Sequence, residues 1–167
     1  MIFGMSTATY TSLHVLISLV GIGSGLVAMS GFLTGKRLDG LTAIFLSSST
    51  LLTSVTGFGF PFDHLLPSHK VGIISLIVLA VAIAARYMFH LASPWRWIYV
   101  IGAATALYLN VFVLVVQAFL KVPALKALAP TQKEPPFLLA QLVVLVVYLA
   151  FTFLAAKKFH IEPAPAA

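Results

Sequence analysis

Long apolar runs, each ended by a short polar or proline-containing break, constrain the fold of this chain more than any other feature. In hydrocarbon every backbone polar group must be paired within the protein, so segments that cross a bilayer are helices or closed barrels. A spanning helix needs about 20 apolar residues, and several runs here reach that length. They predict an all-α integral membrane protein.

The breaks between the runs divide the chain into five segments. The short connections favour antiparallel neighbours, and we expect the tail at 161–167, which is rich in Pro and Ala, to be disordered. The prediction is one transmembrane domain over residues 1–160, with helices at about 10–34, 41–60, 69–91, 97–120 and 137–156.

Composition supports lipid as the solvent of this chain. Hydrophobic residues make up 60 % of it, charged residues 8 %, and the mean hydropathy is +1.07, whereas a soluble domain has about 25 % charged residues. The net charge is +6, but the basic residues are dispersed at the ends of apolar runs, which is typical of contacts with lipid phosphates and not of nucleic-acid binding. With no cysteine, the chain has no disulfide and no thiolate ligand.

The distribution of Lys and Arg predicts the orientation. With five crossings, six basic residues lie on one side and four on the other, and the richer side is normally cytoplasmic. This places the N-terminus outside and the C-terminus inside. The six are Lys36, Arg37, Arg86, Arg96, Lys157 and Lys158, and the four are Lys70, Lys121, Lys126 and Lys133.

Histidines and one acid on the outer side form a candidate metal site. The first helix starts on the same face from which the loop between the second and third segments (58–70) emerges, so its His14 and the loop residues can converge. Imidazole and carboxylate ligands suit zinc, copper or non-haem iron, and imidazole can also be an axial ligand of haem. The alternative is that these histidines are polar anchors at the interface. The candidate ligands are His14, Asp63, His64 and His69.

Amide side chains in the last two segments form a candidate cofactor pocket. Gln117 and Gln141 share a depth in the outer part of the membrane, and Asn110 lies seven residues before Gln117, on the same helical stripe. One interpretation is a hydrogen bond between the two helices. The other is a pocket for a quinone or another amphipathic molecule, contacted by Asn110, Gln117 and Gln141.

Small and hydroxylated residues predict where helices pack. Gly21 and Gly25 have the spacing that lets a second backbone approach closely, and Thr50 and Ser54 share one face of the second segment. In the simpler interpretation, the hydroxyl groups of the second segment form hydrogen bonds to their own helix. In the alternative, they line a polar conduit. We expect Arg86, near the inner end of the third segment, to extend to lipid phosphate.

Several stretches resemble a group of small, uncharacterised multi-pass membrane proteins of proteobacteria. They are residues 35–40, 53–62, 66–75 and 107–132, and the resemblance covers about residues 10–155. It implies a location in the bacterial inner membrane and supplies no catalytic residues.

Three functions are compatible with these features, and none of the segments carries a known catalytic motif. The first is a non-enzymatic subunit of a homo-oligomer or larger membrane complex, assembled through Gly21, Gly25 and the hydroxyl face. The second is a redox protein that holds a metal ion, haem or quinone. The third is a small oligomeric transporter or channel with a path lined by Ser47, Thr50, Ser54 and Asn110.

Overall fold

The computed structural model is built of helices, and the part of the chain it describes contains no β-strand. It describes residues 2–36, 38–60 and 67–159, with the backbone alone for residues 48–50, 67 and 68. The predicted metal ligands Asp63 and His64 and the predicted disordered tail lie outside these residues.

Helix α1 (Thr7–Leu33) begins and ends at local sequence signals. The Oγ of Ser6 accepts a hydrogen bond from the Thr9 amide at 3.1 Å, which caps the first turn. At the other end Gly35 has a φ of 71°, and the amides of Gly35 and Lys36 donate to the carbonyls of Phe32 and Gly31. This is a Schellman ending, in which glycine takes the left-handed conformation at little cost.

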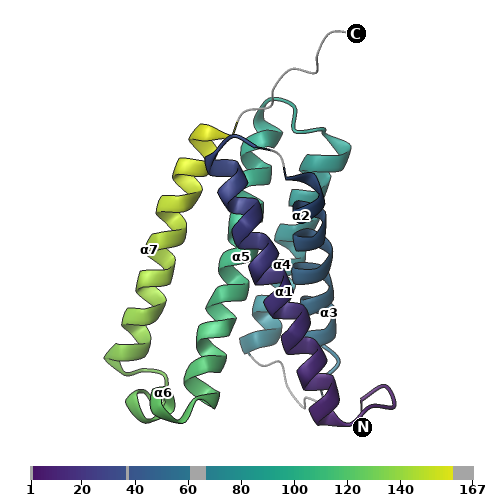
Figure 1. Cartoon of the computed structure of the whole chain (residues 1–167). Helices are drawn as coiled ribbons and strands as arrows, with labels where there is room; N and C mark the ends of the chain where they lie inside the picture. The colour runs from purple at the N-terminus through teal and green to yellow at the C-terminus, as the bar shows by residue number, and fades with distance from the viewer. Residues whose placement is uncertain (1, 37, 61–66, 160–167) are drawn as a thin grey trace.

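Residues 39–57 form three consecutive helical stretches in place of the single predicted helix at 41–60. These are α2 (Asp39–Ile44), a π-helix η1 (Phe45–Leu52) and α3 (Thr53–Gly57). Figure 1 shows α2 above α3 along one line. The wider π-helical turns are the point at which the regular α-helix is interrupted.

The third predicted segment also ends in π-helical turns. It consists of α4 (Pro67–Ile83) and η2 (Ala84–Met88), after which the chain turns at residues 89–93 and enters α5 (Pro94–Lys121). Proline occupies the first position of α5, where its missing N–H costs no hydrogen bond. The helix therefore starts three residues before the predicted residue 97.

The connection from α5 to the last helix contains an element that the sequence analysis missed. Helix α6 (Pro123–Leu128) occupies part of this connection, and α7 (Pro135–Lys158) follows it. Pro123 pre-organises the first turn of α6, and Ala and Leu are strong helix formers. Phe119, Ala129 and Phe137 form a small core against which Leu125 of α6 packs, and this core joins α6 to α5 and α7.

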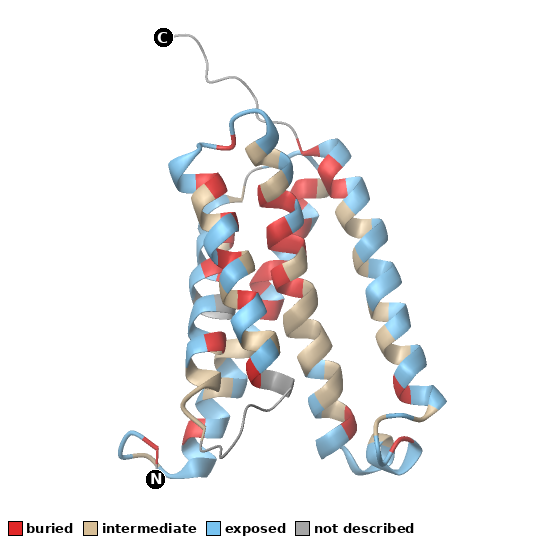
Figure 2. Ribbon diagram, turned by 180° about the vertical axis from the view of Figure 1, so that it is seen from behind, coloured by how far each residue is buried: buried red, intermediate tan, exposed pale blue. Residues whose placement is uncertain are grey.

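Helix α5 is at the centre of the bundle, between α7 and the other helices (Figure 1). Helix α7 stands at one side and diverges from α1 along its length. We call the two ends of the bundle the Tyr10 end, with the starts of α1 and α4 and with α6, and the Arg86 end, with the start of α2, the turn at 89–93 and the end of α7. Buried residues concentrate toward the Arg86 end (Figure 2), where the main core includes Phe32, Phe45, Leu79, Tyr99, Leu107 and Phe159.

Within the described part of the chain, four helices are long and apolar enough to cross a membrane: Thr7–Leu33, His69–Met88, Pro94–Lys121 and Pro135–Lys158. They correspond to the first, third, fourth and fifth predicted segments. The second predicted segment is the interrupted helix over residues 39–57.

Candidate functional site

His14 is held by the neighbouring helical segment at the Tyr10 end. Its Nδ1 lies 2.8 Å from the Thr56 hydroxyl. Because that hydroxyl donates to the Leu52 carbonyl at 2.6 Å, it accepts from the Nδ1–H of His14. The ring also meets Phe60 edge-on, with centroids 5.3 Å apart. This arrangement leaves Nε2 as the unprotonated ring nitrogen, the atom that can bind a metal ion.

Tyr10 fastens α1 to the same segment. Its hydroxyl donates to the Thr56 carbonyl at 2.7 Å, and its ring packs against Phe60 with centroids 5.0 Å apart. A Cβ on Gly59 would overlap the Tyr10 hydroxyl, so the chain passes this ring only with a glycine. Tyr10, His14, Thr56 and Phe60 thus form one packed cluster that sequence spacing did not reveal.

The second described histidine of the candidate metal site lies at the same end. His69 is buried and stacks on Phe58, with centroids 5.4 Å apart. Within the described part of the chain no group of three His, Cys, Asp or Glu residues is placed to hold a metal ion. Asp63 and His64 lie outside it, so the four-residue metal site stays a prediction.

The amide side chains of Gln141 on α7 and of Gln132 in the connection before it form a polar seam with backbone carbonyls of α5. Gln141 on α7 donates from Nε2 to the Phe112 carbonyl of α5 at 3.2 Å, and Gln132 donates to the Val116 carbonyl at 2.8 Å. Two buried atoms in this seam, Gln141 Oε1 and the Tyr148 hydroxyl, have no hydrogen-bond partner among the residues that the structure describes. An unpaired polar atom in an apolar environment is costly, so both lower the stability of the seam.

Asn110 and Gln117 differ in exposure, and Asn110 is half-buried like Gln141. Asn110 is half-buried on α5, and Gln117 is exposed near its end. An apolar crevice of about 130 Å³ lies beside the seam, and neither amide lines it; its walls are Leu26, Met29, Leu107, Val147, Tyr148 and Phe151. The interhelical bond of Gln141 thus goes to a backbone carbonyl, and a quinone pocket formed by the three amides stays a prediction.

The residues that were predicted to pack helices together are buried within the bundle, in each case where the structure describes the side chain. Gly21 and Gly25 are buried, and a Cβ on Gly25 would come within 2.8 Å of the Phe45 ring and 2.7 Å of Leu107. Ser54 is buried, and the side chain of Thr50 is not among those described. Gly25 therefore gives room to neighbours within the same chain.

Arg86 differs from its expected role. Its side chain is 6 % exposed and pairs with the Asp39 carboxylate at the start of α2, and Nη1 donates to the Tyr99 hydroxyl at 3.1 Å. The guanidinium also lies 5.4 Å from the centre of the Tyr99 ring. The expectation that Arg86 reaches lipid phosphate is wrong, because its side chain is buried and bonds to Asp39 and Tyr99 within the bundle. Consecutive predicted segments alternate in direction, so the start of the second and the end of the third are expected at the same end of the bundle, a signal that could have indicated this pair.

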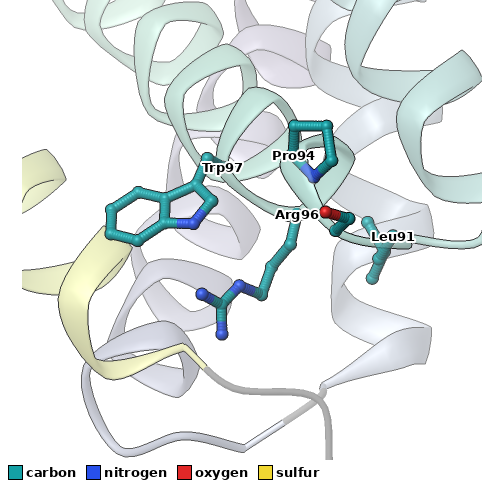
Figure 3. Close-up of a pocket in the computed structure, with 5 residues that line it drawn as sticks. Leu91, Pro94, Arg96 and Trp97 are labelled. Atoms are coloured by element: carbon teal, nitrogen blue, oxygen red, sulfur yellow. The ribbon is translucent and has the colours of Figure 1, made fainter.

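A second arginine lines a concave surface at the Arg86 end. This pocket has a volume of about 530 Å³ and is lined by Leu91, Ser93, Pro94, Arg96 and Trp97. In Figure 3 Arg96 and Trp97 both extend from the first turn of α5, and the guanidinium lies 5.3 Å from the centre of the Trp97 ring.

Glu134 organises the turn that leads into α7. Its carboxylate accepts hydrogen bonds from the Thr131 hydroxyl at 2.8 Å, the Thr131 amide at 3.1 Å and the Lys133 amide at 3.0 Å. Desolvation raises the pKa of Glu134, but the hydrogen bonds from Thr131 and Lys133 together outweigh it, so the pKa lies below its usual value.

Comparisons with known proteins found no match: no family model, no curated protein and no solved structure is significantly similar to this chain.

Proposed function

We propose that this chain is a multi-pass protein of the bacterial inner membrane that acts without catalysis, as a subunit of a homo-oligomer assembled through α7. The four long apolar helices support the membrane part of this proposal. The exposure of α7 supports the assembly part, and it is the observation on which the proposal depends.

We further propose that residues 39–57 form a fifth crossing. Nineteen helical residues extend about 28 Å at 1.5 Å per residue, close to the thickness of the hydrocarbon core of about 30 Å. Five crossings put the termini on opposite faces. The Arg86 end then carries more basic residues than the Tyr10 end and is the cytoplasmic face by the positive-inside rule.

Helix α7 is the least enclosed of the four long helices. Of its most apolar 18 residues, 6 % are buried within the chain, compared with 44 % for α1. Its outward face carries four exposed leucines at intervals of four, three and four residues: Leu138, Leu142, Leu145 and Leu149. This is the heptad spacing that packs two helices side by side in a left-handed crossing.

A second copy of the chain is the partner that fits this leucine stripe best. All copies insert in the same orientation, so two α7 helices meet in parallel and each leucine lies at the depth of its counterpart. Such an interface is isologous, because the same surface serves both subunits. The polar seam of Gln141 and Tyr148 faces α5 and remains inside each subunit.

Disulfide trapping tests this interface, because the chain has no cysteine of its own. Leu142→Cys places a thiol in the stripe, and Val143→Cys is a matched control, since the two neighbours are 54 % and 53 % exposed and lie at nearly equal depth. Oxidation in native membranes should give covalent dimers with Leu142→Cys and Leu145→Cys and few with Val143→Cys, because a disulfide requires Cα atoms about 4.4–6.8 Å apart.

Three other results would contradict self-assembly through α7. Equal dimer yields from Leu142→Cys and Val143→Cys would indicate random collisions. A monomeric mass in lipid, without any disulfide dimer, would exclude the oligomer. A disulfide from Leu142→Cys to a different protein would identify an accessory subunit of a mixed complex.

A further inference from the structure

The concave surface formed by the connection between η2 and α5 has the features of a ligand site. Its volume of about 530 Å³ lies within the range of about 300–1,000 Å³ that is usual for small-ligand sites. It is lined by Leu91, Ser93, Pro94, Arg96 and Trp97, and Figure 3 shows the Arg96 guanidinium and the Trp97 indole extending from the start of α5.

The shape of this surface is held by its own backbone and by one aromatic stack. His90, Leu91 and Ser93 have φ values of 48°, 59° and 45°, a left-handed conformation that non-glycine residues adopt only when the surrounding structure holds them there. The Leu91 side chain is 1 % exposed and anchors the turn in the main core. Phe89 and Trp95 stack with centroids 3.6 Å apart and close the turn on its other side.

The positive charge of this surface favours an anionic ligand. Within residues 2–36, 38–60 and 67–159 Arg96 has no carboxylate partner, whereas Arg86 is paired with Asp39. Lys36, Lys157 and Lys158 lie at the same end of the bundle. Helix α5 also begins here without a side-chain cap from Ser93, so the positive end of its dipole adds to the attraction for an anion.

We propose that this surface binds the phosphate-bearing headgroup of an anionic membrane lipid. A guanidinium matches two phosphate oxygens at once. The site lies at the ends of spanning helices, where headgroups are found, and tryptophan at that level packs against the glycerol region of lipids. Pro94 and Trp97, which are both exposed, provide apolar contacts beside the cation, which suits an amphipathic ligand better than free phosphate. The proposal does not depend on pairing of α7.

Lipid binding by the full-length protein in mild detergent tests the proposal. Native mass spectrometry with phosphatidylglycerol and with phosphatidylcholine should show preferential retention of phosphatidylglycerol. Arg96→Ala should weaken that binding about fivefold, and Arg96→Lys should restore part of it. Lys126→Ala on α6 removes the same charge at the Tyr10 end and is the matched control; it should leave the affinity unchanged.

Equal affinity for the two lipids would overturn the proposal, as would equal losses from Arg96→Ala and Lys126→Ala, which would indicate attraction to the whole surface. Inorganic phosphate should compete weakly, and full displacement of the lipid at millimolar phosphate would instead identify a site for the free anion.

A second measurement covers the case in which Arg96→Ala fails to fold. Trp95→Phe keeps an aromatic ring against Phe89 and leaves Trp97 as the only tryptophan. The fluorescence emission of Trp97 in this variant should shift on addition of phosphatidylglycerol and not of phosphatidylcholine. The same response to both lipids would overturn the proposal.

Discussion

The Arg86 guanidinium and the Asp39 carboxylate form an ion pair between residues 47 positions apart, and this pair joins the end of the third predicted segment to the start of the second. The arginine is 6 % exposed and the aspartate 60 %. Asp39, at the margin of the bundle, therefore neutralises the charge of Arg86, which lies inside it.

Asp39→Ala should destabilise the protein by about 1–3 kcal/mol, because it leaves the Arg86 charge enclosed and without its acid. The loss is smaller than for a fully buried pair, since Asp39 is partly solvated. Thermal unfolding in detergent measures it. In the double variant Arg86→Met/Asp39→Ala the combined loss should be less than the sum of the two single losses, and strict additivity would show that the two groups are not coupled.

Gly25→Ala should destabilise the bundle by about 1–3 kcal/mol, because the added Cβ meets the Phe45 ring and Leu107 and forces them apart. Gly23→Ala is the matched control on the same helix, since nothing lies within 4 Å of its Cβ position. That control should be neutral or stabilise α1 by up to about 1 kcal/mol. Unfolding in a denaturing detergent compares them, and equal losses would contradict the packing at Gly25.

Removing the hydroxyl groups of two tyrosines should have opposite effects. Tyr148→Phe should raise stability by about 1–3 kcal/mol, because it removes a buried hydroxyl that has no partner. Tyr10→Phe should lower stability by about 0.5–1.5 kcal/mol, because it removes the bond to the Thr56 carbonyl. Melting temperatures in one detergent measure both. A loss of stability in Tyr148→Phe would mean that its hydroxyl has a partner in the membrane.

The turn at Glu134 should loosen in acid. The pKa of Glu134 is depressed in the folded protein, so its stabilising effect is complete above the unfolded value of about 4.5 and is lost as the pH falls through the lower folded value. Hydrogen exchange at the Thr131 and Lys133 amides should therefore gain protection from Glu134 at pH 6 and lose it at pH 3. Glu134→Gln should lack this difference, and an unchanged profile would contradict the role of the carboxylate.

The positions of the long helices followed from the sequence because each apolar run of spanning length ends at Gly, Pro or charge. Predicted segments at 10–34 and 137–156 correspond to Thr7–Leu33 and Pro135–Lys158. Helices α1, α5 and α7 begin earlier than predicted. Helix α1 starts after the capping residue Ser6, and α5 and α7 start with a proline in the first turn. The π-helical turns were not predictable, because they arise from packing and not from local propensity.

For the candidate sites, the sequence indicated which polar residues would take part in contacts, but it did not indicate which atoms they would contact. Gln141 forms a hydrogen bond to another helix, which was one of the two interpretations of the amides. Its acceptor is the backbone carbonyl of Phe112 and not a second amide side chain. Any residue supplies a carbonyl, so no sequence pattern marks that acceptor. His14 was predicted as a metal ligand or a polar anchor at the interface. Its partner Thr56 lies in the second segment, whose hydroxyl groups were interpreted as bonded to their own helix, and the Thr56 hydroxyl bonds both to its own helix and to His14.

The sequence by itself determined the class of the protein and the approximate positions of its helices, because the solvation of apolar runs depends only on their length and composition. Tertiary structure alone decided that Arg86 turns inward to Asp39, that Gly25 accommodates Phe45, and that Arg96 is left beside a concave surface. Each of these depends on distances between helices that are far apart in the chain, and those distances are set by how side chains pack.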